Sequence, residues 1–223
     1  MRSHPAISLS LLLTLAGCGA VPGSKPADRA AQSTGASPVS LARPEARQCF
    51  AELGQTGSRF APLPDKYYGA GCSTTNSVRL DGVGGDRHQF TVTNLPAVAC
   101  PLANSFAAWA RFGVDRAAQQ ILGSPLARIE TMGSYNCRTV AGTSRLSGHA
   151  KGNAIDVGAF VLEDGRRVSV LNDWTNGTSA ERRFLRVVHD SACKRFGTTL
   201  GPNYNAAHKN HFHLEADAAD FCR

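Results

Sequence analysis

The stretch "NAIDVGAFVLEDGRRVSVL", residues 153–171, decides the fold class. Two runs rich in β-branched and apolar residues flank the turn residues "EDG", a pattern that predicts a β-hairpin. Shorter strands are expected at residues 77–80, 88–100 and 127–135. A closing strand is expected over "NHFHLEA", residues 210–216. The hairpin is the clearest of these elements.

Two amphipathic helices are predicted between these strands. The first follows Pro101 and ends at Gly123, because apolar residues recur between them at roughly helical spacing. The second begins with Thr178 and Glu181 in capping-box spacing and ends at Gly197. Its buried face would consist of Phe184, Leu185, Val188, Ala192 and Phe196. Since helices and strands are mixed without regular βαβ alternation, the sequence predicts an α+β fold.

The first residues have the pattern of an export signal. Residues 1–18 combine Arg2 with an apolar run over residues 7–15, which is too short for a transmembrane helix. The run ends in "LAGC", which resembles the lipobox of bacterial lipoproteins, where cleavage leaves Cys18 as a lipid-bearing N-terminus. An ordinary secretory signal with a chance cysteine is the alternative, and both interpretations export the protein. By the same resemblance, Gly19 implies the outer membrane of a Gram-negative cell.

A tether and one domain are expected after the signal peptide. Residues 19–46 are rich in Ala, Pro, Ser and Gly, so they cannot bury enough apolar surface to offset the entropy of ordering them. We expect this segment to be a flexible tether to the membrane. Residues 47–223 are then long enough for one domain with its own core. We expect that domain to be monomeric.

The charge of the chain limits its partners. Its net charge is +7 and its pI is near 9.3, which favours anionic partners. In a cell envelope, these would be cell-wall polymers or lipid head groups. The chain has no Lys/Arg run and no interleaving of basic and aromatic residues, so nucleic acid is not expected as a partner.

The cysteines indicate disulfides. Apart from Cys18, an even number of cysteines remains in an exported chain, namely Cys49, Cys72, Cys100, Cys137, Cys193 and Cys222. No CxxC pair exists, so a thiolate zinc site is not expected. Sequence alone does not choose the connectivity. We expect Cys193 to pair with Cys222, which would tie the C-terminal tail to a helix.

Histidines gather near the C-terminus in "HKNHFHLE", residues 208–215. In a strand, His211 and His213 project from the same side, with Phe212 facing the core. Two adjacent imidazoles suit one metal ion, or one ligand beside a catalytic group. By itself, this pair is also compatible with structural or solvated histidines.

A second part of the candidate site lies in "SGHAKGNAID", residues 147–156. Asp156 begins an apolar run, where a buried carboxylate is costly unless it is paired or binds a metal. His149, Asp156 and one histidine of the HxH pair would supply two nitrogens and one oxygen. Three protein ligands with an open position are typical of catalytic zinc. The alternative is that His149 is a turn residue and Asp156 a local cap.

These two motifs resemble the SxHxxGxAxD…HxH signature of zinc D,D-peptidases of the D-Ala-D-Ala carboxypeptidase type. Their fold is shared by lysostaphin-type endopeptidases and hedgehog domains. From about Cys49 to Cys222, the chain looks like the bacterial extensin-like C-terminal domain, through "SYNCR", "SGHAKGNAIDVGAF" and "FLRVVHDSACKRFGTTLGPNYNAAHKNHFHLE". The resemblance implies a small antiparallel sheet that carries a zinc site and is flanked by helices.

The resemblance also implies roles for single residues. The zinc ligands would be His149, Asp156 and His213, and His211 would act beside the metal. Arg138 falls where related peptidases have an arginine that holds the substrate carbonyl or carboxylate, a task that suits a bidentate guanidinium. A surface ion pair is the alternative for Arg138.

One departure from the family pattern concerns the general base. Many carboxypeptidases of this type have a Glu where this chain has Asn210, which cannot accept the proton. Base chemistry would then fall to His211, whose neutral imidazole acts near pH 7, together with His208. His208 matches a histidine of some murein endopeptidases and would be a base, an orienting residue or a solvent-exposed bystander.

Three further residues lie in or near these motifs. Ser147 lacks the surroundings of a GxSxG nucleophile, so it is expected to hydrogen-bond within the metal loop. Glu215 would either support a metal ligand or end an exposed strand. His189, on the second helix, is expected to be structural.

The sequence thus predicts a zinc-dependent peptidoglycan peptidase that acts on D-amino-acid peptides. D,D-endopeptidase activity is preferred over D,D-carboxypeptidase activity because of the departure at Asn210. The alternative is a non-catalytic zinc-containing module that binds the cell wall or a partner protein. A metal-free structural domain is disfavoured by the three candidate ligands.

Overall fold

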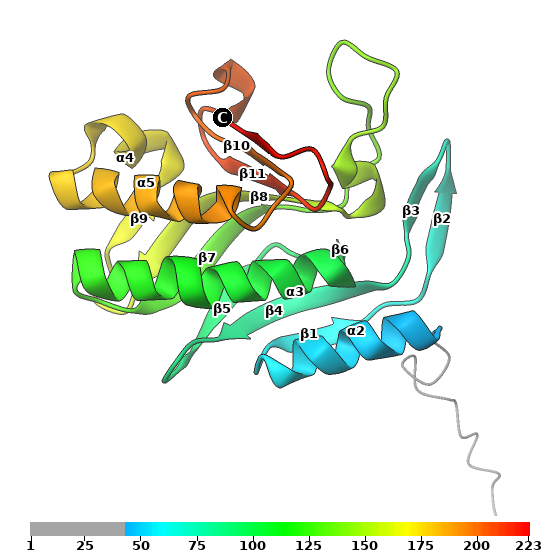
Figure 1. The fold of residues 1–223 in the computed structure, drawn as a ribbon, viewed down its shortest axis with the longest axis horizontal. Coiled ribbons are helices and arrows are strands. Elements are labelled where there is room, and N and C mark those ends of the chain that lie inside the picture. The colour runs from blue at the N-terminus through cyan, green and yellow to red at the C-terminus, as the bar shows by residue number, and fades with distance from the viewer. Residues whose placement is uncertain (1–42) are drawn as a thin grey trace, which may run out of the picture. The chain divides into compact units, whose positions relative to one another are not determined.

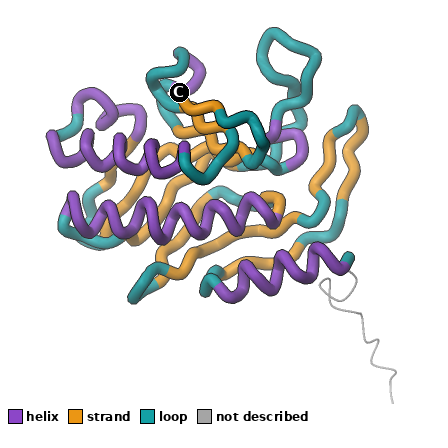
Figure 2. The backbone as a smooth tube through the Cα atoms, viewed as in Figure 1, coloured by secondary structure: helices purple, strands orange, loops and turns teal. Residues whose placement is uncertain are grey.

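The computed structural model describes residues 43–223. The predicted signal peptide, the predicted lipidation site Cys18 and most of the predicted tether lie outside the described residues. Four α-helices and a ten-stranded mixed sheet make up the described part, so the predicted α+β class is confirmed (Figures 1 and 2). No helix among the described residues is long and apolar enough to cross a membrane.

Strand β8 (Ala154–Leu162) lies in the interior of the main sheet. It pairs in antiparallel fashion with β7 (Leu126–Gly133) on one side and with β11 (Phe212–Glu215) on the other. The strand order is β1-β4-β5-β7-β8-β11-β10-β12, with β6 beside β4 and β9 beside β8. The remaining strands are β1 (Arg59–Pro62), β4 (Ser77–Gly84), β5 (Gln89–Thr93), β6 (Val98–Ala99), β9 (Arg167–Ser169), β10 (Thr198–Leu200) and β12 (Phe221–Cys222).

The sheet is larger than the small antiparallel sheet that was predicted, and it is mixed. β5 pairs with β7 in parallel, and so does β10 with β12. The parallel β5–β7 pair follows from the helical crossover between them, because parallel neighbours need a long connection. β10 and β12 have three and two residues, too few to show an alternating pattern in the sequence. A separate two-stranded sheet contains β2 (Lys66–Gly69) and β3 (Cys72–Thr74).

The helices begin close to their predicted positions. α3 (Cys100–Trp109) continues through π-helical turns (Ala110–Asp115 and Ala118–Leu122) to Gly123, whose φ of 73° forms the predicted stop. The predicted hairpin over residues 153–171 is formed by β8 and β9, but its last two residues belong to α4 (Val170–Asn176). The Ser169 hydroxyl caps α4 by accepting from the backbone nitrogen of Asn172.

The second predicted helix ends earlier than expected, and the structure adds an N-terminal helix that was not predicted. α5 (Ser179–Cys193) begins with the predicted capping box of Thr178 and Glu181 but ends before Gly197. The residues of its predicted buried face are all buried, including Phe196 beyond the helix end. α2 (Pro44–Gln55) begins three residues inside the predicted tether and buries Ala46 against the core.

The main core lies between the sheet and the helices α3 and α5, which run side by side along one face of it (Figure 1). The ring of Phe160 on β8 lies 6.2 Å from Trp109 of α3, 5.3 Å from Phe184 of α5 and 6.5 Å from Phe212 of β11. Trp109 Nε1 also donates a hydrogen bond to the carbonyl oxygen of Val188 at 3.2 Å. Phe160 therefore joins both helices to the two strands that carry the candidate site.

Three disulfides join distant parts of the described chain. Cys49–Cys100 links α2 to α3, Cys72–Cys137 links β3 to the segment that follows β7, and Cys193–Cys222 links α5 to β12. The predicted Cys193–Cys222 pair is confirmed. Three disulfides indicate an oxidising compartment, in agreement with the predicted export.

We expect Phe160→Ala to lower the free energy of unfolding by about 3–5 kcal/mol, because it removes a fully buried ring from the centre of the core. Urea unfolding followed by tryptophan fluorescence measures the change. Val187→Ala is the matched control, since this α5 side chain is 39% exposed and should change stability by less than about 0.5 kcal/mol. Equal effects of the two substitutions would contradict the central role of Phe160.

Candidate metal centre

Asp156 and His213 face each other across the β8–β11 pair. Their neighbours Ile155 and Leu214 are part of the core, so the alternation of strand side chains turns Asp156 and His213 toward the face away from α3 and α5. Nδ1 of His213 lies 2.9 Å from Oδ1 of Asp156. The strand register alone thus brings together two of the three predicted ligands.

His149 reaches the same point from the short 3₁₀-helix η3 (Gly148–Lys151). The Ser147 hydroxyl caps this turn by accepting from the backbone nitrogen of His149 at 3.4 Å, as the sequence predicted. Gly152, with a φ of 62°, then reverses the chain into β8. Nε2 of His149 lies 3.2 Å from Oδ2 of Asp156 and 3.2 Å from Nδ1 of His213.

The spacing of these atoms fits a metal ion. Metal–ligand bonds of about 2.0–2.1 Å at tetrahedral angles separate neighbouring ligand atoms by roughly 3.3 Å. The contacts among His149, Asp156 and His213 measure 2.9–3.2 Å, and their ligand atoms all lie within 4.8 Å of one another. Two imidazole nitrogens and one carboxylate are a donor set that zinc accepts. The three residues could therefore hold a metal ion with little movement.

In His149 and His213, the ring nitrogen that points away from Asp156 also has an oxygen partner. Nδ1 of His149 donates to the carbonyl oxygen of Ser134 at 2.5 Å, and Nε2 of His213 donates to the carboxylate of Glu215 at 3.2 Å. Such partners orient metal-binding histidines and leave the inner nitrogen for the metal. Glu215 is two residues after His213 and so shares its strand face, which places its carboxylate next to the candidate ligand His213. Gly148 leaves room for this contact, because a Cβ atom there would lie 2.4 Å from the Glu215 carboxyl group and the carboxylate would have to shift.

The charges of Asp156 and His213 depend on each other. Burial by itself would raise the pKa of Asp156, yet hydrogen bonds from His149 and His213 hold it well below its usual range. Burial would lower the pKa of His213, but Asp156 and Glu215 outweigh burial and raise that pKa to about 9. Without a metal, His213 is therefore an imidazolium between two carboxylates. A metal ion would take the position of its proton on Nδ1.

Two more histidines lie beside the three candidate ligands. His211 is buried, and its Nε2 lies 3.5 Å from Oδ1 of Asp156. Burial lowers its pKa, so the imidazole is neutral at pH 7. The ring of His208 lies 5.2 Å from that of His211 and 5.8 Å from that of His213. Burial, with help from His211 and His213, lowers the pKa of His208 to about 4.

A small pocket opens onto the centre. Its volume is about 90 Å³, and it is lined by Met132, Gly133, Ser134, Tyr135, Asn136, Arg138, His149 and Asp156. Arg138 is exposed at this pocket, and its backbone carbonyl accepts from the nitrogen of Ser147. The positive charge of Arg138 contributes to lowering the pKa values of His208 and His211. Of the predicted site residues, Arg138, His149 and Asp156 line this pocket. His213 and His211 contact Asp156, and His208 lies next to both.

Comparison with known families agrees with these motifs. Residues 47–223 match the family described as extensin-like protein C-terminus. The chain belongs to this family. No curated protein and no solved structure matches the chain. These comparisons do not link the extensin-like domain to D-Ala-D-Ala peptidases, so that resemblance rests on the motif residues alone.

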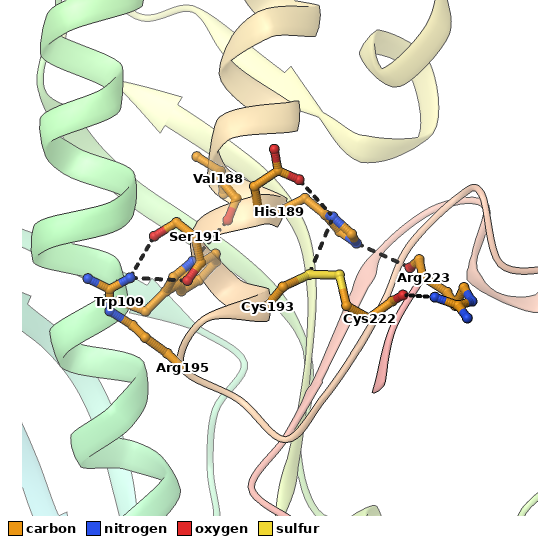
Figure 3. The surroundings of a disulfide bond; sticks show 9 residues. Trp109, Val188, His189, Ser191, Cys193, Arg195, Cys222 and Arg223 are labelled. Carbon is orange, nitrogen blue, oxygen red and sulfur yellow. Dashed lines mark hydrogen bonds and ion pairs between the residues drawn. A yellow bond between two sulfur atoms is a disulfide. The ribbon is translucent and has the colours of Figure 1, made fainter. Parts of the chain in front are cut away.

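A second group with possible metal ligands in the extensin-like domain has a structural role. His189, Cys193 and Cys222 lie close together, but the two cysteines form a disulfide and offer no thiolate (Figure 3). Nε2 of His189 lies 3.2 Å from the carbonyl oxygen of Arg223, and its ring packs against Phe212 at 5.3 Å. This confirms the prediction that His189 is structural.

We expect the metal-free extensin-like domain to lose about 3 kcal/mol of stability as the pH rises from 6.5 to 9.5. The reason is that the pKa of His213 is raised to about 9 in the folded domain from 6.5 in the unfolded chain. The contribution of His213 is thus complete below pH 6.5 and is lost as the pH passes through 9.

Urea unfolding in the presence of a chelator measures this change, with His213→Gln as the matched variant. The variant should show no comparable loss over the same pH range. If the wild type and the variant lost stability in parallel, the interpretation of His213 as a bridging imidazolium would be wrong.

Proposed function

We propose that the extensin-like domain is a zinc-dependent peptidoglycan peptidase. The observation that carries this proposal is the group of His149, Asp156 and His213, whose side chains could hold a metal ion. This group lies next to a pocket that the exposed Arg138 also lines. A structural zinc site has four protein ligands, whereas a catalytic site keeps one position open. Zinc bound there would supply Lewis acidity that activates water and polarises a carbonyl group.

His211 is the residue best suited to move the proton. The amide oxygen of Asn210 can only accept, so Nδ1 of His211 donates to it at 2.9 Å. This leaves the lone pair on Nε2, the nitrogen that lies beside Asp156. A neutral imidazole in this orientation can take a proton near pH 7. Asn210 would thus orient the base in place of the Glu that acts as base in many related carboxypeptidases.

Arg138 would bind the substrate, and His208 would orient the neighbouring His211. The guanidinium of Arg138 suits the carbonyl or carboxylate of a peptide, because it donates two parallel hydrogen bonds. His208 donates through Nδ1 to Oδ1 of Asn205 at 2.8 Å, which holds its ring beside His211. Burial lowers the pKa of His208 to about 4, so the ring is neutral at pH 7. We assign it an orienting role.

D,D-Endopeptidase activity is preferred over D,D-carboxypeptidase activity. Its support is the histidine base with Asn210 in place of Glu, which resembles the murein endopeptidases. The net charge of +7 suits an anionic wall polymer. The disulfides and the lipobox suit a monomeric lipoprotein, exported and anchored through Cys18 to the outer membrane of a Gram-negative cell.

The alternative is a zinc-containing module that binds the wall or a partner without cleaving it. Asn210 is the residue that favours this alternative, since it removes the usual base. The two functions differ in one measurement, the cleavage of muropeptides by protein that contains metal.

We expect the purified protein to bind one zinc ion and to cleave crosslinked muropeptides. His213→Ala should lose both zinc and cleavage, because it removes a ligand. His211→Ala should keep zinc and lose cleavage by roughly 100-fold or more, because it removes the base. Metal analysis and chromatography of the products measure these effects.

His88→Gln is the matched control, because this histidine contacts Leu126, Asp115 and Phe90 and should change neither quantity. Stoichiometric zinc without cleavage in the wild type would reject the peptidase and keep the binding module. Absence of zinc would reject both.

We also expect Arg138→Ala to reduce kcat/KM on muropeptides by roughly tenfold or more, since a charge-assisted hydrogen bond to the substrate is worth about 1.5–3 kcal/mol. Arg145→Ala is the control, because Arg145 is an exposed arginine that follows Arg138 in the same loop. Similar losses from both substitutions would show that only the overall charge of this loop matters.

A further inference from the structure

The β2–β3 ribbon, which we call the tyrosine arm, stands apart from the main sheet (Figure 1). It carries two solvent-exposed tyrosines. Tyr67 is 76% exposed and Tyr68 is 50% exposed. Exposed aromatic residues in such a group often mark a binding surface. The core does not use these rings, so they call for another role.

The two tyrosines of the arm lie on opposite faces of it. The hydroxyl oxygen of Tyr68 lies 3.4 Å from Oγ1 of Thr74, which puts Tyr68 on the face of Thr74. Tyr67 pairs directly with Ser73, on the other face. Only Tyr68 packs on Tyr135, with ring centroids 4.8 Å apart and planes tilted by 30°. Tyr68 and Tyr135 therefore form one aromatic platform, from which Tyr67 is excluded.

This platform is continuous with the candidate metal centre. Tyr135 lines the pocket together with His149. It lies between Ser134, whose carbonyl accepts from Nδ1 of His149, and Asn136, whose nitrogen donates to the carbonyl of His149 at 2.9 Å. The Cys72–Cys137 disulfide fastens the arm to the same segment. The position of the platform relative to the candidate ligand His149 is thus set by covalent and hydrogen bonds.

The pocket alone is too small to bind a wall fragment. Its volume of about 90 Å³ corresponds to roughly three water molecules, whereas pockets for small ligands span about 300–1,000 Å³. It can accept the reacting group and little else. The rest of a polymeric substrate has to lie on the surfaces next to the pocket, and the tyrosine platform is one of these.

We propose that Tyr68 and Tyr135 form a saccharide-binding subsite that holds a sugar of the glycan strand next to the peptide in the pocket. This inference rests on the proposed function. The CH groups on one face of a pyranose ring carry partial positive charge, and they pack on the negative face of an aromatic ring. An apolar peptide side chain would instead need a concave apolar pocket. The rings of a projecting two-stranded ribbon suit the flat sugar better.

The test is calorimetric titration of the full chain with a soluble tetramer of N-acetylglucosamine. Tyr68→Ala should weaken binding by roughly threefold to tenfold, the range expected for one stacking contact. Tyr68→Phe should bind like the wild type, because it keeps the ring. Tyr67→Ala is the matched control, since it removes an exposed tyrosine from the opposite face of the same strand, and it should also bind like the wild type. Thermal unfolding of each variant verifies its fold.

Several outcomes would overturn the subsite: no binding of the tetramer by the wild type, equal losses from Tyr67→Ala and Tyr68→Ala, or no loss from Tyr68→Ala. A sugar-free stem peptide serves as the second probe, and Tyr68-dependent binding of that peptide would identify a peptide subsite instead.

The subsite and the peptidase can fail separately, because binding is measured without hydrolysis. Tyr68-dependent sugar binding with no cleavage of muropeptides would support the subsite and the wall-binding alternative, and it would reject the peptidase. Cleavage that is equally fast with and without attached sugars, and insensitive to Tyr68→Ala, would keep the peptidase and reject the subsite.

Discussion

The contact between Asp156 and His213 across β8 and β11 is the interaction on which the site depends. A carboxylate that is mostly buried in a sheet is costly unless a partner of opposite charge or a metal ion compensates it. His213 provides that partner at 2.9 Å, and His149 and Glu215 complete a chain of alternating imidazoles and carboxylates. A slip of one residue in the pairing of β8 with β11 would turn these side chains into the core, so the register and the site support each other.

Strand β8 serves both faces of the sheet. On one face Phe160 joins α3, α5 and β11 in a packed aromatic core, and on the other Asp156 anchors the polar centre. Packing on the core face fixes the positions of the strands. On the opposite face, short segments that carry His149, His211 and Arg138 complete the site. A packed face and an open face on the same strand suit the proposed site. The packed face keeps the spacing of the candidate ligands accurate, and the open face leaves access for a polymer.

In the proposed mechanism, Asn210 orients His211 as the base, at the position where many related carboxypeptidases have a Glu. The amide oxygen of Asn210 fixes the proton on Nδ1 of His211, and burial keeps that imidazole neutral. Around this centre, the domain offers a small pocket, one arginine and an aromatic platform on the tyrosine arm. These features support the proposed wall substrate, which would extend well beyond the reacting bond.

The sequence by itself determined the elements whose patterns are local. These are the hairpin around "EDG", the capping box at Thr178, and the paired motifs that contain His149, Asp156 and His213. Only the tertiary structure decided the mixed ten-stranded sheet, the contact of Glu215 with His213, and the stacking of Tyr68 on Tyr135. The physical reason is distance along the chain. Periodicity and capping depend on residues a few positions apart, whereas strand order and ring contacts depend on segments that meet only after the chain has folded.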